Sequence, residues 1–152
     1  MAKIVDAETM YTAGLMHYHA LFTDQNYIKA FDWWIKAAEL GHAKAQHSLG
    51  VMYYHAQGVP KNYTKAIQWW TKAAEQGDPN AQNDLGLMHF KGTGVPVSYV
   101  KAYAWISVSK ANGHNKADEM IDSILKILTT KQKTKGQNMA EGISERIKAQ
   151  KK

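Results

Sequence analysis

Histidine is the residue type in this sequence best suited to metal binding or acid–base chemistry, and the chain contains seven. His17 and His19 are two residues apart, so they do not share one face of a helix. His19, His55 and Lys91 recur at a constant spacing, but a lysine in that row argues against a bound cation. Imidazoles on neighbouring helices about 10 Å apart also cannot easily reach one ion at about 2.0–2.1 Å. We therefore predict no metal site.

Other catalytic patterns are not found in the sequence. The serines lack a nucleophile-elbow context and an identifiable partner base, and the acidic residues are scattered without a paired-carboxylate arrangement. There is no phosphate-binding loop or dinucleotide fingerprint. The chain has no cysteine, which excludes disulfides, thiolate nucleophiles and cysteine-rich zinc sites. We predict a protein that is not an enzyme, with no catalytic residues and no cofactor.

An internal repeat with a period of 36 residues is the main feature of the sequence. The matching triplets are Gly14, Gly50 and Gly86; Met16, Met52 and Met88; Tyr27, Tyr63 and Tyr99; Lys29, Lys65 and Lys101; Ala30, Ala66 and Ala102; Trp33, Trp69 and Trp105; and Gly41, Gly77 and Gly113. A period of about 20 to 50 residues indicates stacked units that bury a continuous core together. We predict one repeat domain over 1–152, with repeats at about 5–42, 43–78 and 79–114 and a C-terminal cap at 115–152.

Each repeat has the pattern of two helices. Apolar residues recur at intervals of three and four in the first half, as with Leu49 and Met52, and again in the second half, as with Ala66 and Trp69. Between the halves, the segment 58–60 supplies a glycine for an unusual backbone angle and a proline that ends the helix. We call the two helices of a repeat helix A and helix B. The predicted fold class is all-α, an α/α solenoid of three helix-turn-helix repeats with two C-terminal capping helices.

A glycine lies inside each helix A, where it costs about 1 kcal/mol relative to alanine. Close approach of the facing helix B is the natural reason, because glycine has no Cβ. We expect one small-residue row to lie against this backbone and one tryptophan row to fill the adjacent space. These rows are Ala30, Ala66 and Ala102, and Trp33, Trp69 and Trp105.

The pattern Ala-x-x-x-Leu-Gly-x-Met-Tyr, then Gly-Val-Pro, then Tyr-x-Lys-Ala-x-x-Trp-x-x-Lys-Ala-Ala-x-x-Gly resembles the Sel1-like repeat family, relatives of the tetratricopeptide repeats. The resemblance covers about residues 5–114 and is best in the second repeat. The third repeat has Ser109 and Lys110 where two alanines are usual. In the first repeat, the sequence Phe-Thr-Asp-Gln-Asn at 22–26 takes the place of the glycine loop. The resemblance implies a module for protein–protein interaction, as in bacterial signalling, envelope and host-interaction proteins.

Two helices are predicted after the repeats. One apolar stripe over 116–128 indicates a helix that packs on the third repeat. Thr129 and Thr130 then supply an N-cap for a last helix near 131–149. The stripe consists of Ala117, Met120, Ile121, Ile124, Leu125 and Leu128, and the last helix would use Met139, Ile143 and Ile147 as its main apolar contacts despite Gly136 and Gly142.

By similarity to tetratricopeptide repeats, helix A of each repeat would line a concave groove that binds a partner. The residues on the face of helix A away from helix B form the predicted site. They are Tyr11, Leu15, Tyr18, His19, Lys44, His47, Val51, Tyr54, His55, Asn83, Leu87, Phe90 and Lys91. Tyrosine at such positions suits peptide binding, since it is large, stiff and amphipathic. The alternative is that Tyr18, Tyr54 and Phe90 pack between repeats and never meet a ligand.

Two functions from different classes are compatible with these patterns. The first is an adaptor or scaffold that binds a peptide or protein segment in the groove. The second is a structural repeat protein whose basic C-terminal helix contacts an anionic partner or surface. The formal net charge is +6 and its excess lies in residues 110–152, while the rest of the chain is near neutral. We expect no nucleic-acid partner, no membrane span and a monomer. The chain as written predicts a cytoplasmic protein, or a periplasmic or secreted one if Met1 replaces a removed signal peptide.

Overall fold

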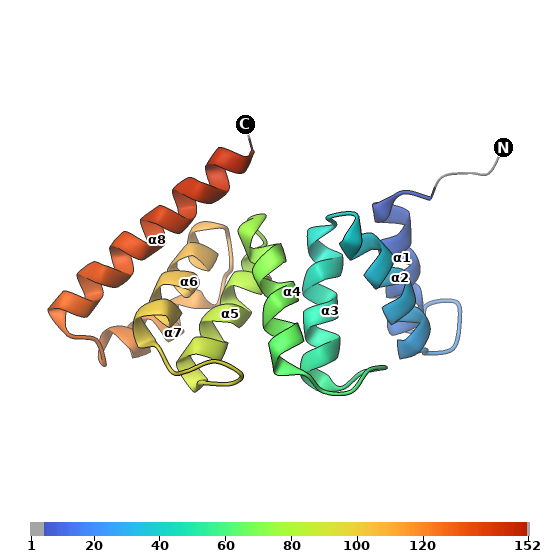
Figure 1. Cartoon of the computed structure of the whole chain (residues 1–152), viewed down its shortest axis with the longest axis horizontal. Helices are drawn as coiled ribbons and strands as arrows, with labels where there is room; N and C mark the ends of the chain where they lie inside the picture. The colour runs from blue at the N-terminus through green and yellow to red at the C-terminus, as the bar shows by residue number, and fades with distance from the viewer. Residues whose placement is uncertain (1–4, 152) are drawn as a thin grey trace. The chain divides into compact units, whose positions relative to one another are not determined.

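The structure, a computed structural model, describes residues 5–151. Over these residues it contains eight α-helices and no β-strand. The helices are α1 (Ala7–Tyr18), α2 (Tyr27–Glu39), α3 (Ala43–His55), α4 (Tyr63–Glu75), α5 (Pro79–Lys91), α6 (Tyr99–Ala111), α7 (Ala117–Leu125) and α8 (Thr130–Gln150) (Figure 1). The helices α1, α3 and α5 are the A helices, and α2, α4 and α6 are the B helices. The predicted all-α solenoid is confirmed.

The chain divides into two compact units, and the division falls inside α4, between Trp69 and Trp70. Unit 1 holds α1, α2, α3 and the first part of α4. Unit 2 holds the rest of α4 and the helices α5 to α8.

The core of unit 1 lies between α2 and the two A helices beside it. Ala30, Trp34, Ala37 and Ala38 form the buried stripe of α2, which packs with buried residues of α3. The glycine of α1 is explained by this packing, because a Cβ at Gly14 would overlap the indole of Trp34. Helix B therefore approaches Gly14 closely, as predicted, but the group over this glycine is the indole of Trp34 and not the predicted Ala30.

The predicted tryptophan row is wrong by one position. Trp33, Trp69 and Trp105 are only half-buried, whereas Trp34 is 2% exposed and Trp70 is 4% exposed. In unit 2 the residue over Gly86 is Ile106, the counterpart of Trp34. Residue 34 follows Ala30 by four positions and lies on the same stripe as Ala37, whereas residue 33 is turned toward the edge of that stripe. The sequence comparison selected positions 33, 69 and 105 because all three hold tryptophan, whereas the buried positions 34, 70 and 106 hold tryptophan, tryptophan and isoleucine.

The loops between helices A and B share one backbone shape even where their residues differ. In the second repeat Ala56 and Gly58 have φ of 56° and 73°. In the third, Gly92 and Gly94 have φ of 68° and 71°. The first repeat lacks these glycines, yet Ala20 and Phe22 have φ of 56° and 61°. Phe22 thus holds a left-handed conformation that costs a non-glycine residue about 1–2 kcal/mol.

In unit 2, side chains fix the turn before α5 to the hairpin that follows. The buried amide of Gln82 donates to the Ala74 carbonyl at 3.0 Å and accepts from Asn112 at 3.1 Å. The hydroxyl of Ser109 donates to the carbonyl of Pro79 at 2.7 Å. Ser109, which departs from the alanine of the family pattern, therefore ties the end of α6 to the start of α5.

The C-terminal helices cover α6. The helix α7 buries Ala117 and Ile124 against Ala102 and Ile106 of α6, and it ends three residues before the predicted bound at 128. The helix α8 begins with the predicted cap, since the Thr129 hydroxyl accepts from the Gln132 amide and the Gln132 side chain accepts from the Thr129 amide. Its predicted position near 131–149 is confirmed.

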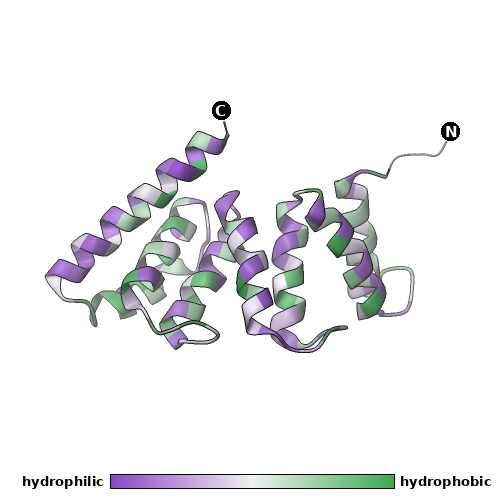
Figure 2. Ribbon diagram, in the orientation of Figure 1, coloured by the Kyte–Doolittle hydropathy of each residue, from purple (hydrophilic) through white to green (hydrophobic). Residues whose placement is uncertain are grey.

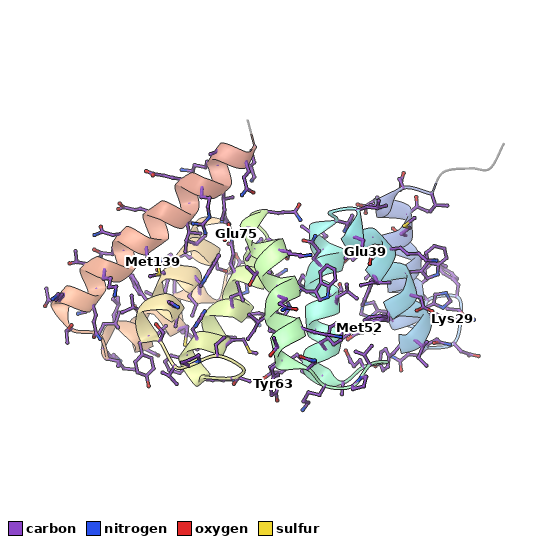
Figure 3. The ribbon with its side chains drawn as sticks, viewed as in Figure 1. Lys29, Glu39, Met52, Tyr63, Glu75 and Met139 are labelled. Atoms are coloured by element: carbon purple, nitrogen blue, oxygen red, sulfur yellow. The ribbon has the colours of Figure 1, made fainter. Side chains whose placement is uncertain are left out.

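The packing side of α8 faces α6, along which it runs (Figure 1). Ile143 and Ile147 are buried with Ala104 and Val108, and Met139 lies on the same side (Figure 3). Its remaining faces are mostly hydrophilic (Figure 2). Within residues 5–151 no helix is both long and apolar enough to cross a membrane.

Candidate partner-binding surface

The predicted site residues lie on the three A helices or directly after them. In unit 1 they belong to α1 and α3, with His19 as the C-cap residue of α1. In unit 2 they belong to α5. His19, Lys44, His55 and Lys91 are exposed, and the other predicted residues are half-buried. The structure thus leaves surface on every predicted position, and binding there stays a prediction.

The aromatic row of the predicted site takes part in packing within each hairpin. Tyr18 lies 5.2 Å from Tyr27, Tyr54 lies 5.3 Å from Tyr63 and Phe90 lies 5.5 Å from Tyr99, measured between ring centroids. Each partner is the tyrosine that begins helix B of the same repeat. Part of each ring is therefore used to hold the hairpin together. The exposed remainder is fixed in place, which lowers the entropy cost of binding a ligand.

Histidine follows tyrosine at the end of both A helices of unit 1. The rings of Tyr18 and His19 meet edge to face at 4.9 Å and 78°, and those of Tyr54 and His55 meet at 4.8 Å and 77°. Tyr18 also donates its hydroxyl to the side-chain oxygen of Gln57 at 2.9 Å. Unit 1 thus presents two copies of one motif, a fixed tyrosine beside an exposed imidazole. Such a motif offers an apolar face and hydrogen-bonding nitrogens to the same ligand.

Another part of unit 1 is organised by a residue that the sequence reasoning missed. Nδ1 of His42 accepts from the amide of Ala45 at 3.1 Å, so this imidazole caps the N-terminus of α3. Nε2 then carries the proton and donates to Glu8 at 2.9 Å. The ring of Tyr11 stacks on the same imidazole at 4.7 Å and 25°. The signal was available, because positions 6, 42 and 78 are one repeat row and the other two hold aspartate, a common N-cap.

The histidines do not converge on a metal. Among residues 5–151, no group of three histidine, aspartate or glutamate side chains is arranged to hold an ion. His17, His89 and His114 each bury an Nδ1 atom without a hydrogen-bond partner in the described part of the chain. Burial lowers the pKa of His89, and the positive charge of Lys101 lowers it further. A lowered pKa keeps this imidazole neutral at physiological pH.

A shallow cleft of about 290 Å³ lies between α6 and α8 in unit 2. Ser107, Ala111, Ala140 and Ser144 line it with small side chains. Glu141, Glu145 and Lys148 also line it. No histidine lines the cleft.

The Sel1 repeat family model matches the chain at residues 7–42, 43–78 and 79–114. A Sel1 repeat protein from Oxalobacter formigenes is 33% identical over 76% of this chain and 47% of its own length, with a TM-score of 0.73. The protein c5321, a protective antigen of uropathogenic Escherichia coli strains with an SLR fold, is 34% identical over 93% of this chain and 30% of its own length, with a TM-score of 0.87. This chain therefore spans less than half the length of either structure.

Among curated proteins none matches the chain. The three matched segments nevertheless follow one another without a gap, and they cover α1 to α6. Repeats of this family generally serve as protein-interaction modules on a non-enzymatic scaffold. The chain belongs to the Sel1 repeat family.

Proposed function

We propose that this protein is a non-enzymatic adaptor that binds a peptide or protein segment along its A helices. The observation that carries the proposal is the repeated pair of unit 1, in which Tyr18 with His19 and Tyr54 with His55 have the same edge-to-face geometry. A repeated surface of rigid aromatic rings beside polar groups suits an extended segment, which can use equivalent contacts in succession. The concave groove that the sequence predicts is part of what we propose.

We assign the half-buried residues of the predicted site to shaping the binding surface rather than to direct contact with the partner. Leu15 and Tyr11 pack against the core of unit 1 with only part of their surface exposed. His19, His55 and Lys44 are exposed on the same two helices and their ends. We therefore propose that the exposed residues make the first contacts with a partner, and that the half-buried residues determine the shape of the surface.

The test begins with the selection of a ligand from a displayed peptide library on the intact chain, followed by calorimetric titration of the selected peptide. The variant His19→Ala with His55→Ala should weaken binding by about tenfold or more, which corresponds to about 1.4 kcal/mol. Both side chains are exposed, so the thermal unfolding temperature should not change. The matched control is Lys36→Ala with Lys126→Ala, two exposed residues outside the predicted site. Equal binding by variant and control would refute the proposed surface.

A second candidate is contact between α8 and an anionic partner. Lys131 and Lys135 are exposed in the first turns of α8, where the positive end of the helix dipole adds to their charge. Truncation near residue 130 cannot test this candidate, because Ile143 and Ile147 belong to the core of unit 2. Lys131→Gln with Lys135→Gln is the suitable variant. If it abolishes binding of the selected peptide and the histidine variant does not, α8 is the binding element.

A further inference from the structure

The exposed apolar side chains of unit 2 lie in the turns that follow its A helices. Val97 in the turn between α5 and α6 is 53% exposed, and Tyr99 at the start of α6 is 36% exposed. Ile127 in the turn between α7 and α8 is 48% exposed. Within residues 70–151 these three are the large apolar side chains that remain exposed.

The two turns lie side by side. Phe90 at the end of α5 and Val100 at the start of α6 pack against a buried cluster that includes Leu128, which follows α7. Both turns therefore lie at the end of unit 2 where α6 begins (Figure 1). We call residues 91–101 and 126–131 together the turn edge.

The turn edge contains no acidic residue. Asp122, one helical turn before Lys126, is the acidic residue nearest to it in the sequence. The cations at the far ends of the helices are paired instead, Lys110 with Asp118 and Arg146 with Glu75. The turn edge thus has an unbalanced positive charge, which comes from the exposed residues Lys91, Lys101, Lys126 and Lys131.

Helix electrostatics explain only half of these lysines. Lys91 and Lys126 lie at the C-terminal ends of α5 and α7, where the helix dipole favours a cation. Lys101 and Lys131 lie in the first turns of α6 and α8, where the dipole disfavours one. After burial, the charge of Lys101 is the second cause that lowers the pKa of His89. Cations at such unfavourable positions point to a negatively charged ligand outside the fold.

Lysines beside exposed apolar side chains match the chemistry of an anionic bilayer surface. The apolar groups can enter the boundary between headgroups and acyl chains while the lysines meet the charged headgroups. Tyr99 suits this boundary, because its ring is held against Phe90 at 5.5 Å between centroids and a tyrosine has one apolar and one polar end. An acidic peptide would account for the lysines alone.

We propose that the turn edge of unit 2 binds peripherally to an anionic phospholipid surface. This function goes beyond the binding of a peptide and uses neither His19 nor His55. It also differs from contact of α8 with an anionic partner, because it requires both turns and the insertion of Val97 and Ile127. A membrane-bound adaptor would hold its peptide partner close to the bilayer.

Cosedimentation of the full chain with phospholipid vesicles tests the charge of the site. We expect binding to vesicles of phosphatidylcholine with phosphatidylserine, and none to phosphatidylcholine alone. Lys101→Gln with Lys126→Gln should weaken binding at least tenfold, since each lysine near an anionic surface contributes about fivefold. The matched control, Lys116→Gln with Lys148→Gln, removes the same charge from exposed residues outside the turn edge and should change binding less than about twofold.

The apolar contribution has its own pair of variants. Ile127→Gln should weaken vesicle binding about fivefold, because about half of that side chain is available for burial in the bilayer. Leu40→Gln changes an exposed side chain in the turn between α2 and α3 and should have no effect. The variant His19→Ala with His55→Ala should bind vesicles normally, so failure of the peptide proposal is distinguished from failure of this one.

Four outcomes would overturn the proposal. The unaltered chain could fail to bind the mixed vesicles, or the lysine variant could lose no more binding than its control. Lys131→Gln with Lys135→Gln could abolish vesicle binding while Lys101→Gln with Lys126→Gln does not, which would make α8 alone the binding element. Polyglutamate could bind as tightly as the vesicles with no effect of Ile127→Gln on either, which would identify a site for acidic segments. Thermal unfolding of each variant verifies that it is folded.

Discussion

Arg146 and Glu75 form a two-point ion pair between α8 and the end of α4, both within unit 2. The Nε atom of Arg146 lies 3.0 Å from Oε2 of Glu75, and Nη2 lies 2.7 Å from Oε1. The hydrogen bonds from Arg146 to Glu75 raise the pKa of the guanidinium further above its ordinary value. The two residues are 71 positions apart in the sequence. The pair therefore joins the C-terminal half of α8 to the end of α4.

Removal of this pair should cost little stability, because the side chain of Arg146 is 51% exposed and that of Glu75 is 29% exposed. Exposed pairs are worth about 0.2–1 kcal/mol, and two-point geometry places this one toward the upper end. A double-mutant cycle with Glu75→Gln and Arg146→Met, measured by urea unfolding, should give a coupling free energy of about 0.5–1 kcal/mol. Strict additivity of the two substitutions would show that the pair does not hold α8.

The two glycines of α8 should respond to alanine in opposite directions. A Cβ at Gly142 would meet open space, so Gly142→Ala should stabilise the chain by about 1 kcal/mol through helix propensity. A Cβ at Gly136 would lie 2.6 Å from the ring of Tyr103, so Gly136→Ala should destabilise unit 2 by about 1–3 kcal/mol. The two single variants form a matched pair, and their thermal unfolding temperatures can be compared directly. Stabilisation by both substitutions would mean that α8 does not pack on Tyr103.

Mild acid should destabilise unit 2 through His89. Because burial and Lys101 lower the pKa of this imidazole in the folded state, the unfolded chain takes up the proton first. The contribution of neutral His89 to the free energy of unfolding is complete above the ordinary pKa of 6.5. It is lost as the pH falls from there toward the pKa of His89 in the folded state. His89→Gln should flatten the pH dependence of the unfolding free energy in this window. A flat profile for the unaltered chain would contradict this assignment.

His42 should act as a helix cap and as a link between α1 and α3. His42→Ala removes the acceptor for the Ala45 amide and the donor to Glu8, and it should cost about 1–2 kcal/mol. His42→Asn keeps a good N-cap side chain and should recover most of that loss. Glu8→Gln reports the remaining contact, since the glutamine oxygen can still accept from Nε2. Chemical denaturation of the three variants gives the order, and equal loss for alanine and asparagine would exclude the capping role.

The sequence was sufficient for the fold because the period of 36 residues carries both the helix bounds and the stacking of units. Beyond the repeats, local patterns placed Thr129 as a cap and Ile143 and Ile147 as contacts of α8, and the structure confirms these positions. The period failed for Trp34, because it aligns identical residues and the buried row changes from tryptophan to isoleucine. The period also missed His42. The capping role of this histidine can be recognised only because it occupies the same repeat position as Asp6 and Asp78.

The candidate site was harder to predict than the fold. Periodicity places Tyr18 and Tyr54 at equivalent positions, but it does not tell which part of each ring Tyr27 and Tyr63 will cover. The first loop has Phe22 where the pattern has glycine, so its shape could not be expected from composition.

The path of α8 has a consequence for synthesis of the chain on the ribosome. Contacts in unit 1 join neighbouring helices, so its hairpins can form soon after they leave the exit tunnel. Unit 2 differs, because Ala104 and Val108 remain uncovered until Ile143 and Ile147 have been added. The codons for α8 therefore complete a core that the earlier helices cannot close, and a stalled or shortened nascent chain would expose apolar surface of α6 to chaperones and proteases.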